Sequence, residues 1–117
     1  MRFLYHPDRK DITLSGVLYA LGDPVRLEIV RLLATIGSQT CAGFDFAIAK
    51  STMSNHFKIL RESGVVFTRK EGTQHINTLR REDINELFPG LLDSVLRSAQ
   101  PLQIYTQETA VKSASPI

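Results

Sequence analysis

The chain has 117 residues, a length that suits one domain with a core of modest size. Its composition, 43% apolar and 22% charged, is that of a globular protein, and no run approaches the roughly 18 apolar residues of a membrane span. The charged N-terminus lacks the apolar stretch of a secretory signal, and Cys41, the only cysteine, excludes an intrachain disulfide. We therefore expect a cytoplasmic protein.

The net charge of +2 is unevenly distributed along the chain. Residues 50–81 contain seven basic and two acidic residues, a balance of 7 − 2 = +5. Residues 1–49 contain five of each and sum to zero, and residues 82–117 give 2 − 5 = −3. A local basic surface is typical of nucleic-acid-binding proteins, although solvated surface charge produces the same pattern. The charge alone leaves both interpretations open.

Two amphipathic helices are predicted in the first third of the chain. Residues 11–21 repeat apolar side chains at the spacing of one helix face: Leu14, Val17, Leu18 and Leu21. Asp23 and Pro24 are suited to the N-cap and first position of a second helix, whose apolar stripe extends to Ile36. Residues 37–40 are expected to form a loop, and residues 41–48 a short helix of about two turns. Phe44 and Phe46 are interpreted as core residues, with an effector pocket as the alternative.

Residues 51–64 predict a helix with two different sides. Ser51 is expected as its N-cap and Gly64 as its stop. At 100° per residue the apolar residues gather on one side, with His56 at their margin: Met53, Phe57 and Leu60. The opposite side carries short polar and basic residues: Ser51, Ser54, Asn55 and Lys58. A recognition helix in a DNA major groove has this arrangement, and an ordinary surface helix with polar caps is the alternative.

A β-hairpin is predicted directly after this helix. Residues 65–69 and 74–79 favour strands, and a turn lies near Glu71 and Gly72. Four polar or basic residues are expected at the hairpin tip: Arg69, Lys70, Thr73 and Gln74. The order of elements predicts a mainly α fold with a small β-hairpin, a winged helix-turn-helix. Residues 1–100 are expected to form this DNA-binding and dimerisation domain, and residues 101–117 a loose tail.

The last predicted helix carries an apolar stripe after a break at Pro89 and Gly90. The stripe contains Leu91, Leu92, Val95 and Leu96. The stripe packs either in the core of one chain or in an interface between two chains. We favour the interface, because a small fold has few other apolar surfaces against which the stripe could pack.

The strings LGDPVRLEIVRLLA and KSTMSNHFKILRESGVVFTRKEGTQHINTL resemble the arsenic-repressor (ArsR) type of winged-helix regulator. The shared features are a D-P-x-R-L helix start, an S-T-x-S-x-H recognition helix, and a basic wing with E-G at its turn. The resemblance covers roughly residues 11–97. It implies a homodimer built from the first and last helices that binds an inverted-repeat operator in double-stranded DNA and represses transcription.

The resemblance also implies roles for individual residues. Residues facing or flanking the operator bases would be Ser51, Thr52, Ser54, Asn55 and His56. The wing residues contacting DNA would be Arg69, Lys70 and Gln74. From the residues themselves, and not from the resemblance, we also expect backbone contacts from Lys50, Lys58, Arg61 and Thr73, since Lys58 and Arg61 can reach phosphates on either side of the helix. The dimer interface would contain Leu14, Val17, Leu18, Leu91, Leu92, Val95 and Leu96.

The chain departs from the metal-sensing members of the family. A thiolate site needs two to four ligands, and only Cys41 lies near the predicted third helix. His6, His56 and His75 are scattered over three elements, so we expect no metal site and no cofactor. Cys41 is interpreted as a small buried residue, with a thiol or redox sensor at a helix N-terminus as the alternative. The sequence identifies neither the effector nor the operator.

Two other classes of function compete with the repressor. A winged helix also serves as a protein-interaction module without DNA, because a fold does not determine a function. An enzyme is the weakest alternative, since no paired carboxylates or Gly-rich phosphate loop occurs. Ser54 and His56 are two residues apart on one helix and do not face each other, so they form no nucleophile–base pair.

Overall fold

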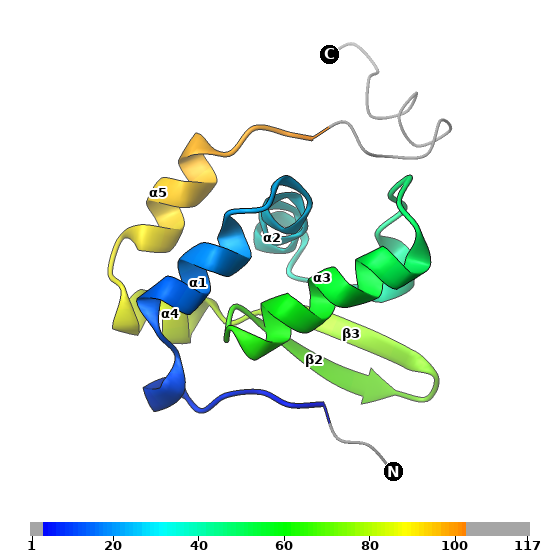
Figure 1. The fold of residues 1–117 in the computed structure, drawn as a ribbon, viewed down its shortest axis with the longest axis horizontal. Helices are drawn as coiled ribbons and strands as arrows, with labels where there is room; N and C mark the ends of the chain where they lie inside the picture. Colours follow the sequence, from blue (N-terminus) through cyan, green and yellow to red (C-terminus); the bar gives the residue numbers. More distant parts are fainter. Residues whose placement is uncertain (1–3, 103–117) are drawn as a thin grey trace.

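A computed structural model describes residues 4–102 (Figure 1). These residues form five α-helices: α1 (Leu14–Leu21), α2 (Pro24–Ile36), α3 (Lys50–Glu62), α4 (Arg81–Leu87) and α5 (Leu91–Ser98). They also form three strands and two 3-10 turns: β1 (Ser38–Thr40), β2 (Val66–Glu71), β3 (Gln74–Leu79), η1 (Arg9–Asp11) and η2 (Cys41–Gly43). The expected mainly α fold with a β-hairpin after the third long helix is therefore present.

The N-terminal boundaries of α1 and α2 follow from their caps. Thr13 Oγ1 accepts a hydrogen bond from the Gly16 amide at 3.1 Å, so α1 begins at Leu14, later than the expected residue 11. Asp23 Oδ2 accepts from the amides of Val25 and Arg26 at 2.9 and 3.1 Å. The prediction of Asp23 as the N-cap of α2 is confirmed.

The segment between α2 and α3 differs from the prediction in both of its parts. Residues 38–40, expected as a loop, form β1, which pairs antiparallel with β3 through Gln39 and Asn77. Residues 41–48, expected as a two-turn helix, form only the η2 turn and then an irregular extended stretch. Phe44 and Phe46 are both buried. Residues two apart point in nearly opposite directions on a helix but share one side of an extended chain, so burying both favours the extended form.

The start of α3 also corrects a prediction. The helix begins at Lys50, its N-cap is Ala49, and no side chain caps it, so Ser51 lies in the first turn and is not the N-cap. The predicted stop is confirmed, because Gly64 adopts φ +89° directly after the helix. A side chain there would also meet Ile12, whose Cδ1 lies 2.5 Å from the position of an added Cβ.

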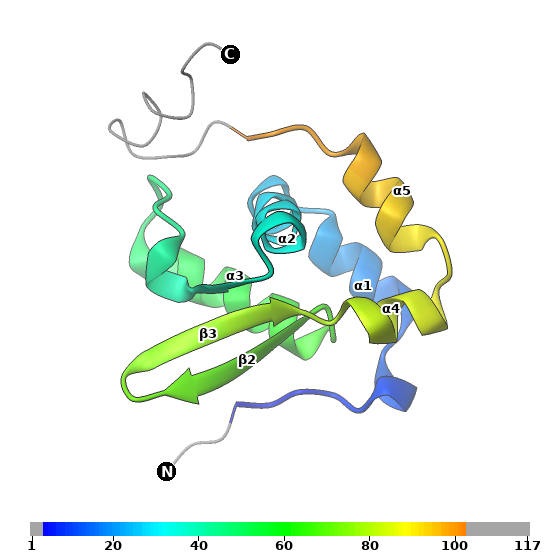
Figure 2. The same cartoon turned by 180° about the vertical axis from the view of Figure 1, so that it is seen from behind.

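The hairpin is longer than expected. β2 and β3 pair in register from Val66 with Leu79 to Glu71 with Gln74. The two-residue turn has Gly72 at φ +61° in its first position, where turns of this length favour glycine. Arg69 and Lys70 therefore lie inside β2 and not at the tip. The sheet order is β1-β3-β2, and residues 4–8 run along the outer edge of β2 (Figures 1 and 2).

A single core joins the helices to the sheet. Its fully buried apolar residues come from the five α-helices, from β2 and from the residue before β2: Val17, Ala20, Ile29, Val30, Leu33, Leu60, Val65, Val66, Ile84 and Leu92. The ring of Phe44 packs against that of Phe57 on α3, with centroids 5.5 Å apart. Both Phe44 and Phe46 thus act as core residues, as predicted, and they compensate for the missing helix before α3.

Candidate nucleic-acid interface

Helix α3 has one buried side and one exposed side. Met53, Phe57 and Leu60 are buried against the rest of the chain, as the periodicity predicted. The exposed residues of its first nine positions are Lys50, Ser51, Thr52, Ser54, Asn55 and Lys58. The helix therefore presents short polar side chains and two cations to solvent near its N-terminal, electropositive end.

His56 is a correction to the predicted set of base contacts. Its side chain is buried with those of the core, and its Nδ1 lies 3.2 Å from Nη1 of Arg26 on α2. A guanidinium only donates hydrogen bonds, so Nδ1 of His56 accepts and Nε2 carries the proton. The residue faces the interior because it completes a polar contact between α2 and α3.

Arg26 is a buried polar residue that the periodicity of α2 did not single out. It is only 7% exposed, and its Nε and Nη2 donate to the carbonyl oxygens of Ala20 and Tyr19 at 2.9 and 3.1 Å. These carbonyls belong to the C-terminal turn of α1, where helix carbonyls lack the usual partner four residues on; the Tyr19 carbonyl also accepts from the Gly22 amide at 3.3 Å. Arg26 therefore connects the end of α1 to His56 on α3. In the sequence, the only feature that distinguished Arg26 was its position as the arginine of the D-P-x-R-L string.

The hairpin that forms the wing lies beside α3 (Figures 1 and 2). Arg69, Lys70, Thr73 and Gln74 are all exposed. Arg69 is paired with Glu71, with Nε 3.0 Å from Oε2, so part of its charge is neutralised. Thr73 and Gln74 lie at the turn itself, next to the first turns of α3.

Apart from Arg69, which pairs with Glu71, the basic residues of the 50–81 segment fall into two groups. Arg80 binds Asp83 and the Pro7 carbonyl, and Arg81 donates to the Ala34 carbonyl. These two charges act within the fold. Within residues 4–102, four other cations of the segment form no side-chain hydrogen bond or ion pair: Lys50, Lys58, Arg61 and Lys70. The four unpaired cations lie on α3 and the wing and are available to an anionic partner.

The predicted dimer residues divide into exposed and buried ones. Leu14 and Leu18 on α1 are each 47% exposed, which is high for leucine in a small domain. Leu91, Val95 and Leu96 on α5 are half-buried, and α5 lies on the same side of the molecule as α1 (Figures 1 and 2). Val17 and Leu92 are 0% exposed, which corrects their assignment, because a residue already enclosed in its own core cannot contact a partner.

Cys41 lies in the η2 turn and is half-buried. Its Sγ is 3.3 Å from Nδ2 of Asn77, whose Oδ1 accepts from Thr68 Oγ1 at 2.7 Å. The premise of an α-helix N-terminus at Cys41 is wrong, because the residue begins a single 3-10 turn. No group of three or more His, Cys, Asp or Glu side chains suited to a metal ion occurs among residues 4–102.

The described part of the chain contains no helix long and apolar enough to span a membrane. The tail predicted at 101–117 lies outside the described residues except for Pro101 and Leu102. The amide of Leu102 donates to Oε1 of Glu28 at 3.2 Å.

Together, α2, α3 and the hairpin, with a polar exposed side on α3, define a winged helix-turn-helix protein. A family model described as a helix-turn-helix domain matches residues 21–69. The uncharacterized HTH-type transcriptional regulator YceK of Bacillus subtilis (strain 168) is 37% identical over 96 residues, 80% of this chain and 96% of YceK. The arsenical resistance operon repressor of Staphylococcus xylosus is 39% identical over 79 residues, 67% of this chain and 76% of the repressor.

A solved structure gives the same assignment. The crystal structure of an ArsR family transcriptional regulator matches with a TM-score of 0.59 and 25% sequence identity, covering 69% of this chain and 90% of that one. The chain belongs to the ArsR family of winged helix-turn-helix transcriptional regulators. The resemblance seen in the sequence is thereby confirmed, and so is the prediction of a regulator and not an enzyme, because these relatives are transcriptional regulators.

Proposed function

We propose that the protein is a cytoplasmic, dimeric repressor that binds an inverted-repeat operator, with α3 in the major groove and the wing along the backbone or in the minor groove. The observation that carries this proposal is the position of Ser54 and Asn55. They are exposed on the first turns of α3, whereas Met53 and Phe57 of the same turns are buried. The relatives named as an operon repressor and as HTH regulators support the same function.

The base contacts are assigned to the exposed polar residues of α3: Ser51, Thr52, Ser54 and Asn55. An asparagine side chain can donate to and accept from adenine at once, and a serine or threonine hydroxyl can bond to several bases. Because α3 is anchored by its apolar side, its first turns are the part free to approach base edges. His56 is not included, since its ring is occupied by Arg26.

The backbone contacts are assigned to the unpaired cations Lys50, Lys58, Arg61 and Lys70. Phosphate contacts supply most of the affinity of such complexes and position the protein without selecting a sequence. Thr73 and Gln74 at the wing turn add hydrogen bonds. Arg69 joins them only by exchanging Glu71 for a phosphate, which gives it a smaller net contribution than an unpaired cation.

The dimer interface is assigned to Leu14 and Leu18 of α1 together with Leu91, Val95 and Leu96 of α5. An inverted repeat requires two recognition helices related by a twofold axis. A dimer through α1 and α5 would therefore account for both the inverted repeat and the exposed leucines of α1. Leu14 and Leu18 are one helical turn apart and form a continuous exposed apolar strip.

The test is selection of DNA fragments from a random pool by the purified protein, followed by fluorescence anisotropy of the enriched duplex at several salt concentrations. We expect an enriched inverted repeat. For about 6–8 phosphate contacts per dimer, the affinity should fall with salt with a log–log slope of about −5 to −7. No enriched sequence, or binding that is insensitive to salt, would favour the protein-interaction module instead.

A further inference from the structure

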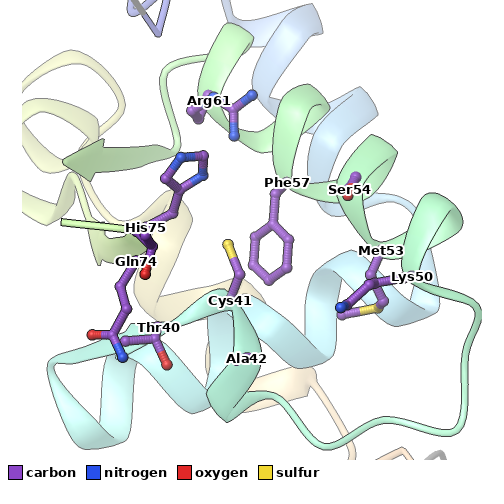
Figure 3. A pocket seen from close by; sticks show the side chains of 11 residues that line it. Thr40, Cys41, Ala42, Lys50, Met53, Ser54, Phe57, Arg61, Gln74 and His75 are labelled. Carbon is purple, nitrogen blue, oxygen red and sulfur yellow. The ribbon is translucent and has the colours of Figure 1, made fainter. Parts of the chain in front are cut away.

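A cleft of about 360 Å³ lies between α3 and the turn of the wing (Figure 3). Its walls come from three segments: residues 40–42 around η2, one side of α3, and residues 73–75 of the wing. The residues of α3 that line it are Lys50, Met53, Ser54, Phe57 and Arg61. We call it the α3–wing cleft. A molecule bound there would touch both of the elements that are proposed to contact DNA.

The middle of the α3–wing cleft is apolar. The sulfur of Cys41 and the ring of Phe57 point toward one another across it, and Met53 lies further along the same wall (Figure 3). Small-molecule sites typically combine an apolar lining of this kind with a few polar groups at fixed positions. The volume and the flat Phe57 ring suit a small aromatic or short aliphatic body.

The ends of the cleft are positively charged. Lys50 lies at one end, and Arg61 and His75 lie at the other (Figure 3). No carboxylate occurs among the 11 lining residues, and neither Lys50 nor Arg61 has an ion-pair partner within residues 4–102. The helix rise between residues 50 and 61 separates the two cations by about 16 Å along the axis, so a small ligand contacts one of them closely.

The Lys50 end is the better place for an anion. It lies at the first turn of the 13-residue α3, where the N-cap Ala49 provides no side-chain acceptor for the free amides. The positive end of the helix dipole therefore adds to the lysine charge, and Ser54 adds a hydroxyl donor nearby. The combination of an apolar middle and one strong anion-binding end selects an amphipathic monoanion.

We propose that the α3–wing cleft binds a small apolar carboxylate, with its carboxylate at Lys50 and its body against Phe57, and that such a ligand excludes DNA. The exclusion rests on the proposed function, since Lys50 and Ser54 would be needed by both partners. The cleft then serves as an effector site that couples recognition helix and wing without a metal or a second cysteine.

The probe for this proposal is 2-naphthoate, titrated into ¹⁵N-labelled protein without DNA and followed by two-dimensional NMR. We expect saturable shifts confined to amides of residues 40–42, 50–57 and 73–75. The dissociation constant should be about 1 mM or lower for a ligand of this size. The uncharged analogue 2-naphthylmethanol should bind at least about tenfold more weakly, because it lacks the charge-assisted contact. Equal binding of the two compounds, or shifts confined to α1 and α5, would overturn the proposal.

Three variants locate the site. Lys50→Gln should weaken naphthoate binding about tenfold, whereas Lys58→Gln, an equally exposed cation of α3 that does not line the cleft, should leave it unchanged. Ala42→Phe should block the cleft, and Ala42 is exposed, so the substitution should keep the melting temperature. Undiminished naphthoate binding by Ala42→Phe or by Lys50→Gln would contradict the assignment.

A DNA-release experiment distinguishes a failure of this proposal from a failure of the proposed function. Naphthoate should release the selected duplex from the wild type, and Ala42→Phe should bind the duplex normally but resist release. If naphthoate bound in the cleft and the complex with DNA persisted, the regulatory part would be wrong. If the wild type bound no DNA at all, the proposed function would fail, while the NMR titration would still decide whether the cleft binds carboxylates.

Discussion

Nη1 of Arg26 lies 3.2 Å from Nδ1 of His56, and this contact joins α2, the helix that follows the Asp23–Pro24 cap, to α3. The same guanidinium donates to two carbonyls at the end of α1. One buried side chain on α2 thus contacts both α1 and α3. The contact between Arg26 and His56 adds to the apolar packing of the buried side of α3. Together they hold the exposed residues of α3 in a defined orientation.

Arg26→Lys is predicted to destabilise the fold by about 1–3 kcal/mol. An ammonium group cannot reach two carbonyls and an imidazole in the planar arrangement of a guanidinium, so buried acceptors lose their donors. Urea unfolding followed by circular dichroism measures the change. Arg97→Lys on α5 is the matched control, because Arg97 is exposed and should change the stability by less than about 0.5 kcal/mol. Equal unfolding midpoints for wild type and Arg26→Lys would show that the contact has no energetic role.

Asn55→Ala is predicted to weaken operator binding by about 1–3 kcal/mol and to relax the base preference at one position of each half-site. The loss arises because alanine cannot make the paired donor and acceptor contacts to a base edge. Anisotropy with a set of single-base variants of the selected operator measures both effects. Asn85→Ala on α4, an exposed asparagine outside the proposed interface, should bind every duplex as the wild type does. A retained preference at all positions in Asn55→Ala would remove this residue from the proposed contacts.

Substitutions of Arg69 and Glu71 are predicted to change the affinity for DNA in opposite directions. Arg69→Ala should weaken binding to all sequences alike and reduce the magnitude of the salt slope by about 1 for each phosphate that is no longer neutralised. In the structure Nε of Arg69 lies 3.0 Å from Oε2 of Glu71. Glu71→Gln should strengthen DNA binding, because it removes a negative charge from the wing and frees the Arg69 guanidinium. The measurement is the salt dependence of anisotropy for both variants. A wing that does not contact DNA would give two unchanged slopes.

Leu18→Glu is predicted to convert the proposed dimer into a folded monomer. Leu18 is 47% exposed in the single chain, so the substitution leaves the core intact, but a carboxylate in an apolar interface would be unpaired. We expect the dimer dissociation constant to rise by about 100-fold or more. Sedimentation equilibrium should then give 13.1 kDa in place of twice that mass. Ile36→Glu, at an equally exposed apolar residue on α2, should remain dimeric. A wild type that is monomeric at all concentrations would contradict the assigned interface.

His6 predicts a loss of stability in acid. Its Nε2 accepts from the Thr68 amide at 2.9 Å, and its ring stacks on Phe67 with centroids 4.4 Å apart. Burial lowers the pKa of His6 below 6.5, and the nearby charges of Arg61 and Arg80 lower this pKa further. The folded state therefore favours the neutral ring, and below 6.5 the unfolded chain takes up the proton first. This contribution to stability is present above pH 6.5 and declines as the pH falls toward the lowered pKa.

The measurement compares urea midpoints of wild type and His6→Ala at about pH 7.5 and about pH 5, on either side of the ordinary histidine pKa. His6→Ala should be the less stable protein at the higher pH, and its midpoint should change less on acidification. His75→Ala, which leaves His6 in place, should retain the full pH dependence. An identical change in wild type and His6→Ala would show that His6 does not titrate with unfolding.

Three local signals were predicted correctly, whereas a fourth, Ser51 as the N-cap of α3, was not. The Asp23–Pro24 cap, the Gly64 stop and the Gly72 turn depend on the chemistry of one or two adjacent residues, and each occurs where it was expected. The segment of residues 38–48 was predicted incorrectly in both parts. Its conformation is set by pairing of Gln39 with Asn77 and by burial of Phe44 against Phe57, contacts with residues that are distant in sequence. Local propensity has no information about such contacts.

The sequence by itself determined the family, the order of the elements and the two sides of α3, because these depend on short motifs and on the 3.6-residue period of the helix. The tertiary structure alone decided that His56 is enclosed, that Val17 and Leu92 belong to the core, and that Lys50 shares a cleft with the wing turn. Periodicity gives the direction of a side chain around its own helix. What the side chain meets in that direction depends on the neighbouring elements, here Arg26 for His56 and the hairpin turn for Lys50.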